Sequence, residues 1–410
     1  MLRIFALFVA LAVPVASLAQ TPRGSIEIDD VRGNARFHAG PLYATPMLLL
    51  KEFGIDSNVF NETGEQKSDF TFTLAPKADI WVPVARRALL KGMVATDLVW
   101  YREYDAERSV DPQLSLRGEF YLNRVTLFAE RSYLSTRERP NFEIDSRSRR
   151  VEDTLTAGAE FTLTPTMSLE VAGHRLDTRY DSGAEFDGTS LQRILDRERS
   201  GLQLTARRRL TALTSVSVRY ETFLDRFTYS PMRDSHSYGV LPGVEFQPRA
   251  LINGSAYVGY REFTPEVTTA LPEFRGLVAQ LGLSYTLLGA TTFGVAYNRD
   301  LSYSYLELQP FFVDNSIGVS IRRALGSRFD ALVSADRHKY EYRDAITDGG
   351  IVAAAPRTDM TWNVAGSVGY RLGRDGRVAF GVSYWQREST TGPLRDYDNL
   401  RVGSTISYGF

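Results

Sequence analysis

The chain has 410 residues, of which 43% are hydrophobic, 12% aromatic and 24% charged, and this composition excludes a disordered chain. The formal net charge of −1 removes any general electrostatic case for a nucleic-acid partner. Because the chain has no cysteine, disulfides, thiolate metal sites and cysteine nucleophiles are excluded. A mean hydropathy of −0.22 excludes a bundle of membrane helices but not a membrane β-barrel, whose polar lumen face offsets its lipid face.

The first residues have the pattern of an export signal. A positive start at Arg3 precedes an apolar run from Ile4 to Ala16, and small residues lead up to Ala19. We predict a signal peptide at residues 1–19, cleaved on export. The alternative is a membrane anchor, but the run is shorter than the ~20 residues that a span needs. Residues 20–45 show no long alternation, and we interpret them as a periplasmic lead-in segment, either loose or packed into a barrel as a plug.

From residue 46 to the end, apolar and polar residues alternate with a period of two. In the last stretch, Val402, Ile406 and Tyr408 share one face, while Arg401 and Thr405 share the other. Successive side chains of a strand point to opposite faces, so each run predicts a strand with one apolar and one polar side. The runs are about 10–15 residues long, longer than the ~5–6 of soluble strands and sufficient for the ~9–11 of a tilted membrane strand.

The connections between these runs alternate in length. Short turns, as at Asn123-Arg124, alternate with longer polar stretches, as at 139–150 and 181–195. Short turns on one rim and long loops on the other are typical of outer-membrane barrels, which places both termini in the periplasm. The expected strand centres lie near residues 50, 75, 95, 117, 131, 156, 173, 203, 220, 241, 257, 280, 297, 317, 335, 365, 382 and 403.

The predicted fold is therefore all-β, a single transmembrane antiparallel β-barrel over residues 46–410. It has about 18 strands, with 16 as the alternative, short periplasmic turns and longer extracellular loops. Lipid offers no hydrogen-bond partners to the backbone, so the sheet must close on itself. The competing fold is an exported β-propeller, but the recurring blade motifs of such a protein are missing from the sequence.

The C-terminus adds a second indication of the outer membrane. Tyr408 and Phe410 resemble the terminal aromatic assembly signal of outer-membrane barrels, although Thr405 stands where that signal usually has glycine. We predict that these two aromatic residues act as the membrane-assembly signal. Phe410 is expected on the lipid face, in a last strand that pairs with the first near Leu49. The expected partners are the assembly machinery, outer-membrane lipid and lipopolysaccharide.

Residues that would carry catalysis are scarce. The chain has four histidines, and the patterns of a serine nucleophile elbow, a zinc protease or a phosphate-binding loop are missing from the sequence. His174 falls on the lumen side of its strand, where a lone histidine is more often a network residue than a general base. We therefore expect no enzymatic activity, no cofactor and no metal site.

Function is expected on the lumen side of the strands, where both charge signs and several aromatic residues occur. The predicted pore-lining residues are Trp81, Tyr101, Arg117, Tyr121, Arg207, Arg219, Tyr257, Arg261, Arg322, Arg371, Trp385 and Arg387. Two interpretations stay open for the charged members. They form cross-strand ion pairs that fill the interior, or they line a mixed-charge pore that selects weakly by sign.

The stretch Gly54–Phe60 has the pattern G-x-D-S-N-x-F directly after the first predicted strand. In a barrel of this length with a signal peptide, this pattern resembles the putative beta-barrel porin 2 family, and the likeness extends from about residue 46 to the end. Some members of that family accompany exopolysaccharide or capsule export. The resemblance implies an outer-membrane channel or export accessory, with polysaccharide or export-system components as partners, and it implies no catalytic residue.

Three functional classes remain open on the sequence alone. The first is a pore that helps exopolysaccharide or another carbohydrate cross the outer membrane, and its lumen should carry rings that stack on sugars. The second is a general diffusion porin, which should fold one long loop into the lumen, with 181–195 and 344–356 as the longest candidates. The third is an occluded structural barrel.

Overall fold

The computed structural model describes residues 35–409, except residues 86, 249, 268–271, 345, 348–349, 352–356 and 391–394. The predictions for the signal peptide and for Phe410 lie outside the described residues. The wall strands are β2 (Leu42–Asp56), β3 (Asp69–Val84), β4 (Ala88–Tyr101), β5 (Ser109–Tyr121), β6 (Val125–Thr136), β7 (Arg150–Thr164), β8 (Met167–Tyr180), β11 (Arg197–Arg209), β12 (Thr214–Phe227), β13 (Ser235–Phe246), β14 (Ile252–Pro265), β15 (Phe274–Leu287), β16 (Thr291–Tyr303), β17 (Phe311–Leu325), β18 (Phe329–Arg343), β21 (Thr358–Leu372), β22 (Gly376–Ser389) and β23 (Tyr397–Gly409).

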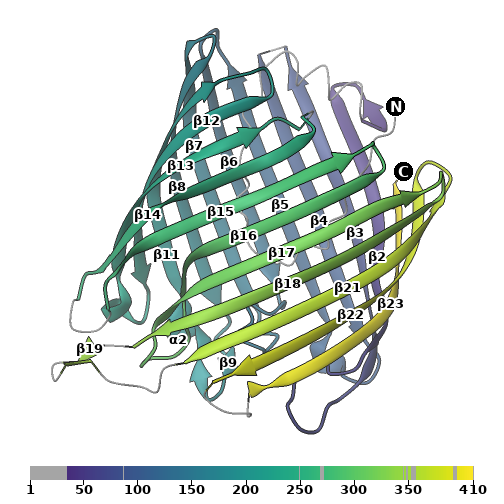
Figure 1. Ribbon diagram of the computed structural model, residues 1–410, viewed down its shortest axis with the longest axis vertical. Helices are drawn as coiled ribbons and strands as arrows, with labels where there is room; N and C mark the ends of the chain where they lie inside the picture. Colours follow the sequence, from purple (N-terminus) through teal and green to yellow (C-terminus); the bar gives the residue numbers. More distant parts are fainter. Residues whose placement is uncertain are drawn as a thin grey trace.

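These strands form a closed antiparallel barrel (Figure 1). Each strand pairs with the next along the chain, and β23 pairs with β2 to complete the ring. Of the 19 strands in the sheet, all except the short β1 (Phe37–Ala39) belong to the ring, which therefore has 18 strands. The predicted fold class and strand number are confirmed, and each expected strand centre falls inside a wall strand.

The two rims of the barrel differ as the alternating connections predicted. The chain ends and the short turns lie at one rim, here called the terminal rim, and the longer connections lie at the other, here called the loop rim (Figure 1). Strand β2 begins at Leu42, before the predicted start at residue 46. The described end of the lead-in segment lies along the terminal rim, where β1 pairs with β2 and Arg36 donates to the Gly409 carbonyl at 2.8 Å.

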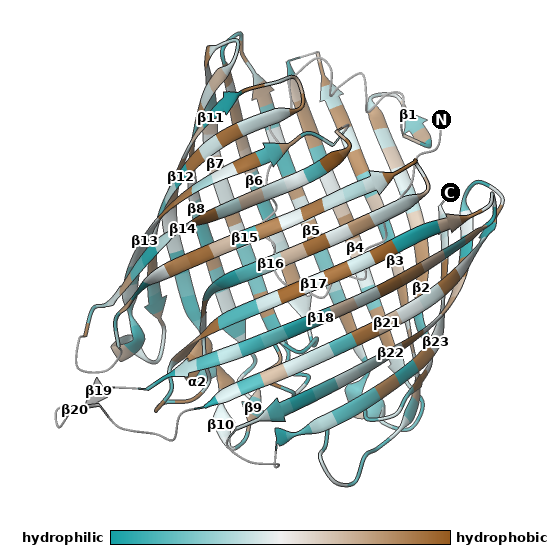
Figure 2. Cartoon of the chain, viewed as in Figure 1, coloured by the Kyte–Doolittle hydropathy of each residue, from teal (hydrophilic) through white to brown (hydrophobic). Residues whose placement is uncertain are grey.

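The outward side chains of the wall form an apolar surface. Leu277, Leu116 and Phe380 are 63%, 59% and 56% exposed, as expected of residues that face lipid rather than a protein core. On β21, Val364 and Val368 are exposed, while Asn363 points inward and is buried. Hydrophobic residues recur along the strands, whereas the ends at the loop rim are mainly hydrophilic (Figure 2). Among the described residues, no helix is long and apolar enough to cross a membrane.

Residues of the Gly54–Phe60 pattern contact the last strand at the seam, where β2 pairs with β23. The β2–β23 register shifts between Leu50 and Phe53, and a Cβ on Gly54 would lie 2.0 Å from the Val402 carbonyl oxygen, so only glycine fits there. The Asn58 backbone N–H donates to the Asp56 carboxylate at 3.0 Å, which forms a local turn. The Asn58 side chain donates to the Asp398 carbonyl at 2.9 Å and thereby joins the first connection to the last strand.

The seam has the predicted register. Leu48 pairs with Tyr408 and Leu49 with Ser407, so the last strand meets the first near Leu49. Tyr408 is 48% exposed and points outward, on the face expected to contact lipid. The described part of the predicted assembly signal therefore lies at the seam, where its pairing completes the ring.

Candidate functional site in the barrel lumen

The connection between β6 and β7, residues 137–149, folds into the mouth of the barrel. Its turn is set by Asn141, whose side-chain oxygen accepts from the backbone N–H groups of Glu143 (2.8 Å) and Ile144 (3.0 Å). An asparagine in this position holds a tight turn without regular secondary structure. The tip of the loop is buried, with Glu143 and Ile144 both 0% exposed.

This loop reaches the opposite wall. Counting pairings around the ring from β7 to β18 gives nine through β8 and nine through β6. The ring of Phe142 nevertheless lies 4.6 Å from that of His338 on β18 and 5.6 Å from that of Trp385 on β22. Residues 137–149 therefore span the lumen, a role that the sequence had suggested for the longer connections 181–195 and 344–356.

A buried ion-pair network fastens the loop to the far wall. The Arg387 side chain is 0% exposed and donates to Asp145 in the loop and to Asp359 on β21, the latter at 2.8 Å. Arg357 donates to both oxygens of Asp359, at 3.0 and 2.5 Å. We call Asp145, Arg357, Asp359 and Arg387 the latch. Because buried charges are costly to leave unpaired, each member depends on the others.

Glu143 lies beside the latch in an unusual environment. One carboxyl oxygen accepts from the Ser304 hydroxyl at 2.6 Å, and the other is buried, with the Tyr342 hydroxyl near the carboxyl group. Burial raises the pKa of the Glu143 carboxyl to about 7, although Ser304 and Arg357 partly offset this effect. The loop tip therefore carries an acid that changes charge near neutral pH.

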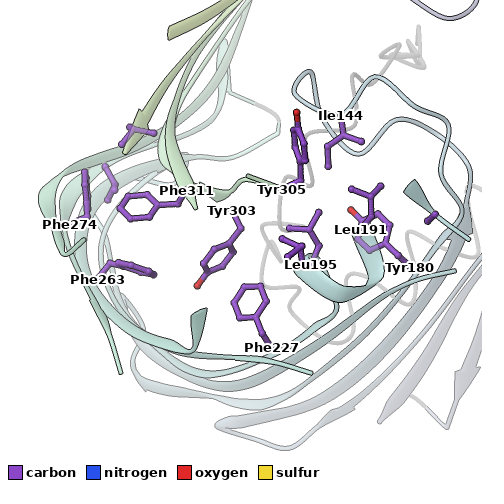
Figure 3. Packing of buried hydrophobic residues seen from close by; sticks show 14 of the residues in the cluster. Ile144, Tyr180, Leu191, Leu195, Phe227, Phe263, Phe274, Tyr303, Tyr305 and Phe311 are labelled. Atoms are coloured by element: carbon purple, nitrogen blue, oxygen red, sulfur yellow. The ribbon is translucent and has the colours of Figure 1, made fainter. Parts of the chain in front are cut away.

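A second connection, residues 181–196, thickens one side of the lumen. It contains the short helix α2 (Leu191–Leu195), whose Leu191, Ile194 and Leu195 are buried. Figure 3 shows Leu191 and Leu195 on the same side of the barrel as the rings of Phe227, Tyr303 and Phe311, and these rings belong to β12, β16 and β17. We call this apolar cluster and the strands β12–β17 that carry it the packed wall.

Arg233 links two of the connections next to the packed wall, residues 181–196 and 304–310. It belongs to the short helix η2 (Pro231–Arg233), and its guanidinium donates to the carbonyls of Ile194 (3.1 Å), Ser304 (2.6 Å) and Pro310 (2.5 Å). Burial lowers the pKa of Arg233 to about 10. The connections 181–196 and 304–310 thus converge on one buried cation of the connection between β12 and β13.

The other side of the lumen is charged, and several of its side chains are partly exposed. Lys51 pairs with Asp97 at 2.7 Å, and Lys77 pairs with Asp79 at 3.2 Å, with 38% and 29% of the latter two side chains exposed. Nearer the terminal rim, Lys91 and Arg117 both contact Glu119. We call this surface on β2–β6 the charged wall, and its members are Lys51, Lys77, Asp79, Lys91, Asp97, Arg117, Glu119 and Glu130.

The predicted pore-lining residues near the charged wall differ in how far they are covered. Arg117 belongs to that wall. Trp81 and Tyr121 are half-buried and pack around Leu89 together with Tyr43, near the terminal rim. Tyr101 is buried beneath the Arg147 guanidinium, 5.4 Å above its ring.

The predicted residues on the packed wall and on the adjacent strand β11 are in contact with neighbouring side chains. Arg207 on β11 pairs with Glu170 at 2.8 Å, and Arg261 on β14 pairs with Asp300 at 2.6 Å. Arg219 lies 4.0 Å above the ring of Tyr257, which is 1% exposed. A tyrosine covered in this way offers no free face to a sugar.

The remaining predicted residues lie between β17 and β22. Arg371 lies 3.8 Å from Asp330, and Arg322 is within electrostatic range of the same carboxylate. Trp385 packs against Phe142 of the crossing loop, and Arg387 is the centre of the latch. Their alternation predicted that these residues point inward, but nothing in the alternation indicates which of them the loops cover.

The comparisons with known proteins agree with the barrel. The family model described as Putative beta-barrel porin 2 matches residues 38–408. No curated protein sequence matches the chain. Among solved structures, the chain is similar to a BenF-like porin from Pseudomonas fluorescens Pf-5, with a TM-score of 0.50, 12% identity, and coverage of 90% of this chain and 98% of that one. It is also similar to OpdK from Pseudomonas aeruginosa, solved with vanillate, with a TM-score of 0.47, 10% identity, and coverage of 91% and 100%. At these identities the likeness concerns the fold.

Proposed function

The chain belongs to the Putative beta-barrel porin 2 family, and from this premise we propose that it is an outer-membrane channel through which small carbohydrates diffuse. The observation that carries the proposal is the charged wall, which extends from Lys51 to Lys91 and is the more exposed side of the lumen. The packed wall and the crossing loop narrow the remaining space, so the passage suits small molecules.

The chemistry of the charged wall supports a hydroxylated solute. Its cations and carboxylates alternate at close range, so donors and acceptors lie beside one another. A sugar hydroxyl both donates and accepts, and it can replace water at such groups with little net loss of hydrogen bonding. Because most of these charges are paired, selection between cations and anions along this wall should be weak.

An aromatic cluster at the terminal rim favours carbohydrate among hydroxylated solutes. Tyr43, Trp81 and Tyr121 pack around Leu89, and the Tyr121 hydroxyl donates to Glu119 at 2.6 Å. The three rings are half-buried, so they combine an apolar face with neighbouring polar groups. Tyr257 and Trp385, which the sequence also suggested as stacking residues, are covered by Arg219 and Phe142.

A role as an accessory pore in exopolysaccharide export is the second candidate. The same aromatic cluster favours it, since a polymer that leaves the periplasm would meet these rings first. In this case, polysaccharide or components of an export system would be partners. The two candidates differ in the length of the carbohydrate, not in the chemistry of the wall.

Planar-bilayer recording of the purified barrel tests the proposal. We expect steady conductance that oligosaccharides block, and we expect the Trp81→Ala variant to weaken this block about tenfold, because stacking on the ring contributes to binding. Trp385→Ala is the matched control and should change the block little. Conductance without oligosaccharide block would indicate a general diffusion porin, and a closed barrel would indicate a structural role; either result would refute the carbohydrate channel.

A further inference from the structure

A hollow of about 790 Å³ opens at the loop rim above the charged side of the lumen. The crossing loop 137–149 lines it together with the connections at 57–68, 102–108 and 181–196. Five guanidinium groups line it, and they belong to Arg108, Arg137, Arg139, Arg147 and Arg149. We call this hollow the vestibule.

The arginines of the vestibule share few carboxylates. Arg137 and Arg147 both approach Glu107, at 3.7 and 3.4 Å, and Arg149 approaches Asp111 at 3.7 Å. Arg139 donates to the Val59 carbonyl, and Arg108 donates to a backbone carbonyl as well, at 2.6 and 2.8 Å respectively. A carbonyl satisfies the hydrogen bond but does not neutralise the charge, so this side of the vestibule stays positive.

The acidic residues of the vestibule do not remove this excess. Asp145 is engaged by Arg387 of the latch, which lies outside the vestibule lining. Asp181 and Glu185 lie on the side formed by the connection 181–196 and are exposed to solvent. The vestibule therefore has a basic side and an acidic side, and the basic side has more charged groups.

Arg147 carries a more specific indication of a ligand. Its side chain is only 10% exposed, and its Nε is buried 3.4 Å from a Glu107 carboxylate oxygen without making an aligned hydrogen bond to it. A better-placed acceptor would therefore gain a charge-assisted hydrogen bond from this guanidinium. The guanidinium is held over the ring of Tyr101 at 5.4 Å and by a hydrogen bond to Ser109 at 3.2 Å, so its position is fixed before any ligand arrives.

We propose that the vestibule binds the carboxylate of a sugar acid before the solute enters the lumen. Guanidinium groups bind carboxylates through paired, charge-assisted hydrogen bonds, and the exposed acids on the opposite side can accept from sugar hydroxyls. Phe60 and Phe186 also line the vestibule and offer apolar surface to the ring of the sugar. Entry of the captured solute into the lumen rests on the proposed channel function, whereas binding in the vestibule does not.

Equilibrium binding to the purified full-length barrel tests this assignment. Calorimetric titration with glucuronate and with glucose compares two sugars that differ by one carboxylate, and we expect glucuronate to bind at least tenfold more tightly. The double variant R108Q/R149Q should lose that preference, since both side chains are accessible at the vestibule rim. R226Q alters an arginine near the loop-rim end of β12, outside the vestibule lining, and should leave both affinities unchanged.

Each outcome decides the assignment. Equal affinity for the two sugars would overturn it, as would an unchanged preference in R108Q/R149Q that retains the heat-modifiable mobility of a folded barrel. Competition by inorganic phosphate as strong as that by glucuronate would overturn the preference for a sugar acid, because the vestibule would then hold any anion. Binding of glucuronate to a barrel that shows no conductance would support the vestibule while refuting the proposed channel.

Discussion

The two sides of the lumen are built from the same alternating strands yet differ in physical character. On the charged wall, Lys77 and Asp79 keep 38% and 29% of their side chains exposed. On the packed wall, Arg261 and Glu221 form an ion pair with 10% and 5% exposed, and Phe311 is buried under the loops. The difference arises from the connections 181–196 and 304–310, which cover the packed wall, whereas the crossing loop contacts both sides through Ile144 and Arg147.

The comparison predicts that removing a cation has very different consequences on the two sides. Arg387→Ala should leave Asp145 and Asp359 buried without their shared partner, a change that typically costs about 3–5 kcal/mol. The crossing loop should detach from the far wall while the barrel itself remains closed. We expect higher single-channel conductance and faster proteolysis within residues 137–149.

The matched control for Arg387→Ala is Arg387→Lys, which keeps the charge but not the guanidinium fork, and which should detach the loop only in part. Conductance and proteolysis equal to those of the native protein in Arg387→Ala would contradict the latch. Loss of the heat-modifiable form would show that Arg387 supports the barrel rather than the loop.

The local stability of the packed wall should also depend on its apolar contacts. Leu191→Ala removes a fully buried side chain from the centre of the cluster, and such truncations cost about 2–5 kcal/mol. The loss should be local, since α2 belongs to a connection and not to the ring. Amide hydrogen exchange across residues 181–196 should accelerate, while exchange in β3 and β4 stays unchanged. Leu308→Ala, at a side chain that is 54% exposed, is the control.

Glu143 should make the crossing loop sensitive to pH. Because burial raises its pKa to about 7, the folded loop favours the protonated acid, and its stability falls as the pH rises from the unfolded value near 4.5 through about 7. Conductance should therefore increase between about pH 6 and pH 8. Ser304, Tyr342, Arg357 and Asp359 surround the carboxyl, so the ionised form meets both signs of charge.

Glu143→Gln separates this effect from other titrations. The amide keeps the shape of the protonated acid and cannot ionise, so the variant should have the low-pH conductance of the native protein at every pH. A native conductance independent of pH, or a pH response that persists in Glu143→Gln, would rule out this carboxyl as the sensor.

The sequence predicted the wall of the barrel because alternation is a local property. Residues such as Val402 and Arg401 reveal their faces through their immediate neighbours, and lipid on one side makes the apolar face continuous. The seam was also predictable near Leu49, since the first and last strands must pair in a closed ring.

The arrangement inside the barrel was not predictable from the same signal. The tip of the crossing loop is set by contacts between Glu143 and Ser304 and between Asp145 and Arg387, residues that are distant in the chain. Alternation placed Tyr257 and Trp385 on the lumen side but gave no indication that Arg219 and Phe142 cover them. A turn-forming asparagine before an isolated acid and an apolar residue, as at Asn141–Ile144, was the available sequence signal for the loop tip.

The charged wall should show the smallest change in stability and the clearest change in selectivity. In the double variant Lys51→Glu and Lys77→Glu, two partly exposed ion pairs are replaced by like charges, and pairs of this kind contribute only about 0–1 kcal/mol each. The barrel should therefore fold normally. The lumen side near β2 and β3 becomes negative, so the reversal potential in a salt gradient should shift toward cation selectivity, and the shift should shrink as salt screens the added charge.

Lys339→Glu is the matched control, because Lys339 pairs with Glu341 on the outward face of β18 and its reversal should leave selectivity unchanged. An unshifted reversal potential in the double variant would mean that permeating ions do not pass along the charged wall, and the two sides of the lumen would then differ in exposure but not in function.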